Sequence, residues 1–183
     1  MSIFTILDES YRVAWGDLCY TKENLPEVLL TSLIGPMLYL LAFGYGVGSS
    51  IGPDYLVFII PGIVGLTTLS ATFSTVSMKI LVQRLFYMSF DELLLCPIHI
   101  SSVIIGKTLS GVIRALLSCT ILLAVGWILA PGITISPLVF VVILVSSFMF
   151  SLLGLLAGML TRKTQSLSLF SSIVIVPMTF LCG

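Results

Sequence analysis

Long apolar runs alternate along the chain with short polar segments, and this alternation predicts helices that cross a membrane. A hydrocarbon core of about 30 Å takes about 20 apolar residues to cross. Spans are expected over residues 28–47, 55–78, 108–130, 137–160 and 166–183. Helix kinks are expected at three prolines within these runs, Pro36, Pro61 and Pro177. The expected fold is all-α, a polytopic membrane protein that forms one domain over residues 1–183.

The first 26 residues follow a different pattern. Apolar side chains recur at helical spacing from Ile3 to Leu18, while charged side chains fall on the other face: Asp8, Glu9, Arg12 and Asp17. A helix this charged does not span a bilayer but suits the headgroup plane, with Trp15 in the interfacial aromatic belt. We therefore expect an interfacial helix within residues 1–26.

A polar segment over residues 79–107 separates the second span from the third, and we expect it in the cytoplasm. Ser89 and Glu92 have the spacing of a capping box, in which each side chain accepts a hydrogen bond from a free backbone N–H. Pro97 limits the predicted helix to about two turns. Two interpretations remain equally open on this pattern: an ordinary interfacial loop, or a surface helix that receives force from another protein.

Composition supports the membrane class and excludes several others. The 183 residues are 58% hydrophobic and 9% charged, with zero net charge and a mean hydropathy of +1.20, whereas soluble domains carry about 25% charged residues. Neutral charge argues against nucleic acid as a partner. The four cysteines are widely spaced and there is one histidine, so neither a metal site nor a disulfide framework is expected.

Candidate catalytic residues and an internal energy source are also missing from the sequence. The stretch Gly106-Lys107-Thr108 is similar to the end of a phosphate loop, but Ser101 stands where the motif needs its first glycine. No carboxylate follows Glu92, which makes an internal proton relay improbable. We therefore expect no enzyme activity and no cofactor in this chain.

Basic residues predict the orientation. With the N-terminus inside, all eight Lys and Arg lie on or near the cytoplasmic side, and the outer turns 49–54 and 131–136 contain none. A multi-pass protein of the cell membrane with a cytoplasmic N-terminus is expected. Four basic residues are interpreted as membrane anchors, a role favoured over ligand binding for the first two: Lys107, Arg114, Arg162 and Lys163.

Small and hydroxylated residues mark two of the spans. The second span is rich in Thr and Ser from Thr67 to Ser77, which favours helix packing over a polar path through the membrane. Gly154 and Gly158 form a Gly-x-x-x-Gly pattern in the fourth span, a spacing that lets helices approach closely.

Several stretches together resemble one known family. Gly35–Gly44 resembles its first span, Tyr55–Gly62 the Pro-Gly start of its second, and Pro177–Gly183 the end of its fifth. Between them, Phe90–Ile98 resembles the family's acidic, Leu-Leu, Pro segment, followed by Gly106-Lys107 at the usual distance. The family is that of the type-2 permeases of ATP-binding cassette exporters, in the branch of nodulation-factor and daunorubicin exporters.

This resemblance implies a permease subunit that has six spans, forms a homodimer or heterodimer, and works with separate ATPase subunits that bind ATP and Mg. It places the coupling helix, which contacts the ATPase, at seven residues: Ser89, Phe90, Asp91, Glu92, Leu93, Leu94 and Pro97. It assigns an interface helix, also in contact with the ATPase, to Tyr11, Arg12, Trp15 and Asp17. The expected function is outward transport of an amphiphilic drug, lipid or glycolipid-type substrate.

Two departures from the family pattern keep alternatives open. Met88-Ser89 stands where Gly-Thr is common, and the sequence stops at Gly183, where the family continues with a re-entrant hairpin and a sixth span. We therefore expect a C-terminally truncated permease. The alternatives are a non-transporting, membrane-anchored assembly or immunity factor, an inactive truncated permease, and, more distantly, a proton-driven exporter.

Overall fold

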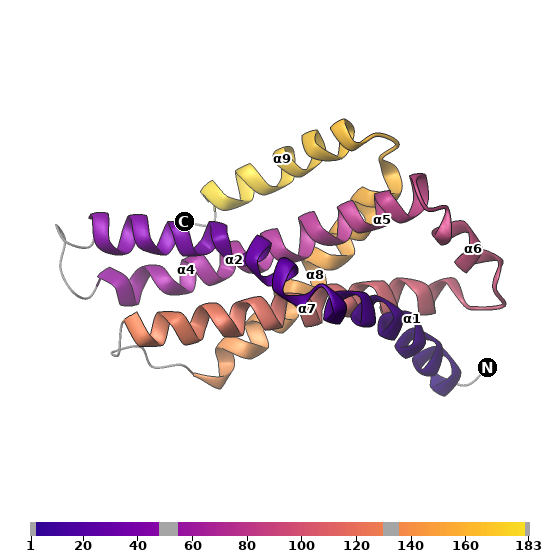
Figure 1. The fold of residues 1–183 in the computed structure, drawn as a ribbon, viewed down its shortest axis with the longest axis horizontal. Coiled ribbons are helices and arrows are strands. Elements are labelled where there is room, and N and C mark those ends of the chain that lie inside the picture. Colours follow the sequence, from indigo (N-terminus) through magenta and orange to yellow (C-terminus); the bar gives the residue numbers. More distant parts are fainter. Residues whose placement is uncertain (1–2, 48–54, 130–135, 182–183) are drawn as a thin grey trace.

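The computed structural model describes residues 3–47, 55–129 and 136–181, which form helices joined by short connections (Figure 1). These ranges contain no strand, so the predicted all-α fold is confirmed. The predicted outer turns, apart from Ser136, and residues 182–183 lie outside the described ranges. The elements are α1 (Ile3–Glu23), α2 (Leu25–Leu41), η1 (Ala42–Val47), α4 (Tyr55–Leu69), η2 (Ser70–Ser74), α5 (Thr75–Leu85), α6 (Ser89–Leu95), α7 (Ile100–Leu129), α8 (Pro137–Leu160) and α9 (Thr164–Leu181).

Three continuous helical stretches of the described chain are long and apolar enough to cross a membrane: Ile59–Leu85, Ile100–Ile128 and Pro137–Leu160. The first joins α4, η2 and α5. A fourth span results if α1 and α2 are taken together, while the apolar part of α9, Thr164–Thr179, is shorter. The polytopic membrane fold is confirmed, and the count of five spans stays a prediction.

Helix α1 does not continue the direction of α2, because the two are bent by 82° relative to each other. Asn24 lies between them, and Pro26 lies in the first turn of α2, where its missing N–H leaves no hydrogen bond unmade. Pro36, Pro61 and Pro177 lie inside α2, α4 and α9, each of which continues past its proline. The expected kinks at these three prolines stay predictions.

Two helices extend further than their apolar runs. The second span was expected to end at Met78, but its helix continues to Leu85, and the third was expected from Thr108, but α7 begins at Ile100. Lys79 and Lys107 therefore lie within helices and not in a loop. Both ammonium groups have a carboxylate partner, which explains why charge does not end either helix here.

Close contact between α8 and the helix of the second span depends on Gly154 and Gly158. A Cβ atom at Gly154 would lie 2.8 Å from the carbonyl oxygen of Phe73, and one at Gly158 would lie 2.7 Å from that of Ser77. Neither distance is possible for a real side chain without movement of the backbone. The Gly-x-x-x-Gly pattern thus has a specific role, which is to bring α8 against η2 and α5.

Candidate functional site

The short helix α6 lies between α5 and α7 at one end of the bundle (Figure 1). Phe90 is only 4% exposed and packs in an apolar cluster with Val76 and Ile80 of the second span and Val103 of α7. Leu93 is half-buried against the same cluster. Helix α6 is therefore fixed by its inner face to two long helices of the bundle.

The start of α6 differs from the predicted capping box. Met88 precedes the helix in the left-handed conformation, with φ 51° and ψ 6°, and no side chain caps the first turn. Ser89 is therefore the first helical residue and does not act as the N-cap, so the capping-box prediction is wrong. The other end is as the proline predicts: α6 stops at Leu95, and Cys96, just before Pro97, is extended.

The outer face of α6 and the chain before it expose large apolar side chains. Leu95 is 86% exposed, Phe86 70% and Tyr87 73%, and Met88 and Glu92 are exposed as well. We call these five residues the α6 surface. Of the predicted contact residues, Pro97 is also exposed, whereas the side chains of Asp91 and Leu94 lie outside the described part. The sequence signal for Phe86 to Met88 was a run of four large apolar residues, Leu85 to Met88, between Arg84 and Ser89.

Helix α1 crosses α7, and both helices run the same way (Figure 1). Its contact face consists of small or polar residues, and four of them are buried: Ser10, Ala14, Asp17 and Thr21. Tyr11 and Trp15 form an exposed aromatic stripe with ring centroids 5.8 Å apart. Arg12 and Asp8 form an exposed ion pair at 3.0 Å on a third face. Helix α1 thus offers one face to the bundle, an aromatic stripe suited to lipid headgroups, and a charged face suited to water.

Contacts between α1 and α7 recur every four residues at a constant offset of 93. The carboxylate of Glu9 accepts a hydrogen bond from the hydroxyl of Ser102 at 2.8 Å, and the hydroxyl of Ser110 donates to Asp17 Oδ2 at 3.3 Å. Between them Gly106 has no side chain where the backbone and Val13 of α1 would meet one. Successive turns of α1 therefore contact successive turns of α7.

Glu9 also accepts a hydrogen bond from the backbone N–H of His99, at the start of α7. The hydrogen bonds from Ser102 and then His99 lower the pKa of Glu9. A carboxylate at a helix N-terminus is favoured by the helix dipole. Glu9 therefore stays ionised and holds the first turn of α7 against α1.

Asp17 is the centre of a buried charge cluster. Its Oδ1 lies 3.0 Å from Lys107 Nζ and 3.2 Å from Lys79 Nζ, and Lys107 also donates to Gln83 Oε1 at 2.9 Å. Burial alone would raise the pKa of Asp17, but its attraction to Lys107 and Lys79 outweighs burial and lowers it. Asp17 is thus a charged link between α1, the second span and α7. It does not lie on a solvated face with Asp8 and Arg12, as the sequence pattern had indicated.

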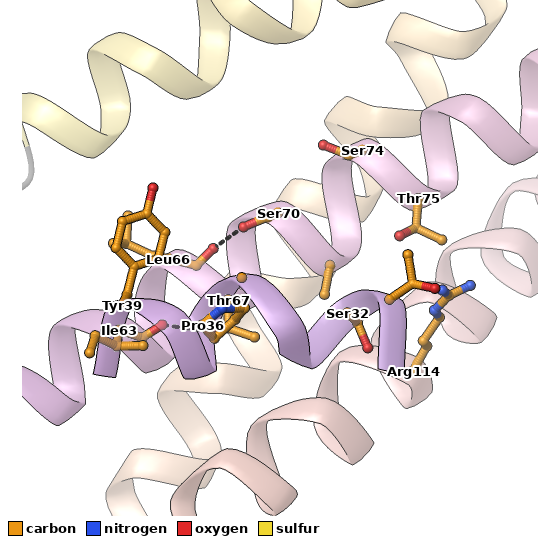
Figure 2. A pocket seen from close by; sticks show the side chains of 13 residues that line it. Ser32, Pro36, Tyr39, Ile63, Leu66, Thr67, Ser70, Ser74, Thr75 and Arg114 are labelled. Carbon is orange, nitrogen blue, oxygen red and sulfur yellow. Dashed lines mark hydrogen bonds between the residues drawn. The ribbon is translucent and has the colours of Figure 1, made fainter. Parts of the chain in front are cut away.

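Lys107 and Arg114 do not lie where membrane anchoring would place them. The ammonium group of Lys107 is buried and bonded to Asp17, so it is not free to reach headgroups. The half-buried side chain of Arg114 lines a cavity between helices (Figure 2). For these two residues the anchoring interpretation is corrected. Arg162 and Lys163 are exposed just after α8, where anchoring stays a prediction.

Helices α1 and α6 share a cleft of about 480 Å³, with Arg12, Gly16 and Asp17 on one side and Glu92 and Leu93 on the other. Lys107 of α7 lines the cleft as well. The two helices predicted to contact a partner are therefore neighbours. Within the described residues, no cluster of His, Cys, Asp or Glu has the composition of a metal site.

Comparison with known proteins places nearly the whole chain in one family. The profile of the ABC-2 type transporter family matches residues 5–183. Over 163 residues the chain is 28% identical to the inner membrane transport permease YadH of Escherichia coli (strain K12), a match that covers 86% of this chain and 63% of the relative. The permease of the same name in Shigella flexneri gives the same identity and coverage. The chain therefore spans less than two thirds of the length of these relatives, and no solved structure matches it.

Proposed function

Because the chain belongs to the ABC-2 type transporter family, whose members are transport permeases and are not themselves catalytic, we propose that it moves an amphiphilic drug, lipid or glycolipid-type molecule outward, with ATP hydrolysed by a separate cytoplasmic subunit. That subunit binds ATP and Mg, and the permease works as a homodimer or heterodimer. The family match confirms the resemblance drawn from the sequence at the level of the ABC-2 type transporter family. Substrate class, export direction and partner arrangement belong to this proposal.

The observation that carries the proposal is the two-sided character of α6. Its inner face is held in the bundle by Phe90, while Leu95 and Glu92 on its outer face have no cover. Exposed apolar side chains beside an acidic one favour contact with a protein surface. A partner that binds the α6 surface pushes on a helix that cannot move without the second span and α7.

Helix α1 strengthens this mechanical coupling. Because Asp17 joins α1 to both Lys79 and Lys107, a force on α1 acts on the same two long helices as a force on α6. The exposed ion pair of Arg12 and Asp8 leaves a charged face for the partner. The ATPase is therefore proposed to contact α1 and α6 together across their shared cleft.

Co-purification with a co-expressed ATP-binding cassette ATPase tests the docking site. Leu95→Asp and Glu92→Lys should each reduce the amount of ATPase recovered with the permease, because they place unfavourable charge on the α6 surface. Glu23→Lys is the matched control, since Glu23 is an exposed carboxylate at the far end of α1. Undiminished recovery with both α6 variants would remove the docking site from the proposal.

Labelling tests the orientation. Cys96 is exposed next to α6, so in a background with Cys19→Ser and Cys182→Ser a membrane-impermeant maleimide should react with it in inverted vesicles and not in intact cells. Buried Cys119 serves as the internal negative control. Labelling of Cys96 in intact cells would place α6 outside and overturn the proposed mechanism.

A further inference from the structure

A second cavity, of about 310 Å³, lies within the bundle between α2, the helix of the second span and α7 (Figure 2). Small-molecule sites start at roughly this size, about 300 Å³. Its apolar lining comes from Pro36, Ile63, Leu66 and the ring of Tyr39. Hydroxyl groups line it as well, those of Thr31, Ser32, Thr67, Ser70, Ser74 and Thr75.

Arg114 is the charged residue that lines this cavity, and its charge has no partner in the described part of the chain. Its Nε is buried without a hydrogen-bond acceptor. Figure 2 shows its side chain reaching from α7 toward the end of the cavity where Ser32 and Thr75 lie. An ionised group within a membrane-spanning helix is energetically costly when it lacks a counter-ion. Such residues commonly mark ligand or ion sites.

The hydroxyl groups divide into two sets. Those of Thr31, Ser32, Thr67 and Ser70 donate to carbonyl oxygens of their own helices. Those of Ser74 and Thr75 make no hydrogen bond with any described residue, so their donors remain available. Among the described residues, no carboxylate lines the cavity. The lining of the cavity therefore combines a cation with hydroxyl groups whose donors are unmatched, and these are the groups that an oxyanion needs.

The π-helical turn η2 contributes to this arrangement. Ser70 and Ser74 are its first and last residues, and both line the cavity. Turns of this kind are rare and occur frequently at functional sites. The two ends of this turn belong to different hydroxyl sets. The hydroxyl of Ser70 donates to the carbonyl oxygen of Leu66 in α4, whereas that of Ser74 makes no hydrogen bond to its own helix.

We propose that this cavity binds the oxyanion headgroup, phosphate or carboxylate, of an amphiphile, with the guanidinium group of Arg114 as counter-ion and the hydroxyls of Ser74 and Thr75 as further donors. The apolar side chains of Ile63 and Leu66 contact the adjoining part of the tail. The role of this amphiphile as cargo rests on the proposed permease function, whereas its binding does not.

Binding is measured on the purified chain in dodecyl maltoside, without ATP or partner, so that failure of the ATPase-docking proposal leaves the result intact. Dodecyl phosphate is the probe, and its affinity is followed by microscale thermophoresis. Arg114→Gln should weaken binding about tenfold or more, and Thr75→Val about tenfold, because each removes a hydrogen bond to a charged group. Lys163→Gln removes an exposed positive charge elsewhere and should leave affinity unchanged.

Arg114→Lys guards against a folding artefact, because it keeps the charge but loses the planar fork that matches an oxyanion. Its affinity should lie between those of the wild type and Arg114→Gln. If Arg114→Gln is monodisperse and binds dodecyl phosphate as tightly as the wild type, the proposal is overturned. Equal binding of dodecanol would overturn it as well, because the headgroup would then be irrelevant.

Two further measurements identify the source of the headgroup. Inorganic phosphate should bind more weakly than dodecyl phosphate, and equal affinity would refute an amphiphile as the ligand. Native mass spectrometry then distinguishes a resident phospholipid, retained by the wild type and lost from Arg114→Gln, from a transported amphiphile, for which no co-purifying lipid is found. Either result supports the site.

Discussion

Asp17 of α1 and Lys107 of α7 lie 90 residues apart in sequence, yet their Oδ1 and Nζ atoms are 3.0 Å apart and both side chains are buried. A second cation, Lys79, shares the same carboxylate oxygen at 3.2 Å. Removing one member of such a cluster leaves the others charged and unpaired in a medium that cannot solvate them. The charge cluster that links α1 to the second span and α7 therefore depends on a single carboxylate, that of Asp17.

Replacing Asp17 by asparagine should lower the free energy of unfolding by about 3–5 kcal/mol, the usual loss when one partner of a buried ion pair is removed. Thermal or denaturant unfolding in a neutral detergent measures the change. Asp8→Asn on the same helix is the control, and because its ion pair with Arg12 is exposed it should cost at most about 1 kcal/mol. Equal losses from the two variants would show that the Asp17 cluster does not hold α1 in place.

The same cluster predicts a specific pH dependence. Because the pKa of Asp17 is lowered in the folded chain, its contribution to stability is complete above the ordinary aspartate pKa of about 3.9 and is lost as the pH falls through the lower folded-state value. The wild type should therefore lose stability faster than Asp17→Asn between about pH 5 and pH 3. Glu9 shifts in the same direction, so the comparison is made in a Glu9→Gln background. Parallel pH curves in that background would contradict the assignment.

Local pattern was sufficient for most of the fold. The apolar runs located the long helices, and Pro97 located the end of α6, because chain connectivity and backbone chemistry act over a few residues. The partner of Asp17 was not accessible in this way. Lys79 and Lys107 lie on other helices, and nothing within α1 distinguishes Asp17, which is buried, from Asp8, which is exposed.

Two further differences have the same physical origin. Arg114 resembles an anchoring residue in sequence because it lies near the end of an apolar run, but the helices that enclose its side chain come from residues 31 to 75. The capping box at Ser89 failed because Met88 adopts the left-handed conformation that starts α6 one residue earlier than expected. Local spacing in the sequence could not predict the backbone conformation of Met88. It also could not predict which distant helices pack around Arg114.

Met88 offers a test of backbone strain at the start of α6. It is the non-glycine residue with positive φ in the described chain. Glycine tolerates this conformation and a β-branched residue does not, so Met88→Gly should exceed Met88→Val in unfolding free energy by about 1–2 kcal/mol. Phe86 is the control, because its φ of −102° is ordinary and the same two substitutions should not favour glycine there. The thermal unfolding midpoints of the four variants measure these differences. An equal preference for glycine at both positions would contradict backbone strain at Met88.

Substitutions at two glycines should have opposite effects. A Cβ atom at Gly158 would lie 2.7 Å from Ser77 O, so Gly158→Ala forces α8 away from α5 and should cost about 1–3 kcal/mol. Gly65 has nothing within 4 Å of that position, so Gly65→Ala should stabilise α4 by up to about 1 kcal/mol through helix propensity. Both changes are read from thermal unfolding in detergent. Stabilisation by both alanines would show that the small residue at Gly158 is not required for packing.

Phe90 and Leu95 lie on opposite faces of α6, so their substitution should affect different properties. Phe90 should matter for stability and transport, and Leu95 for binding of the ATPase. Phe90→Ala empties part of the cluster formed with Val76, Ile80 and Val103, and the expected loss for such a change is about 3–5 kcal/mol. Because Leu95 and Glu92 remain, the ATPase should still co-purify, but ATP hydrolysis should no longer drive transport in vesicles.

Leu95→Ala should leave the unfolding free energy nearly unchanged and reduce the recovery of the ATPase. Phe90→Leu keeps most of the buried volume and should restore transport. If Phe90→Ala abolishes partner binding while Leu95→Ala does not, α6 meets its partner by the face now assigned to the bundle, and force reaches the spans by another route.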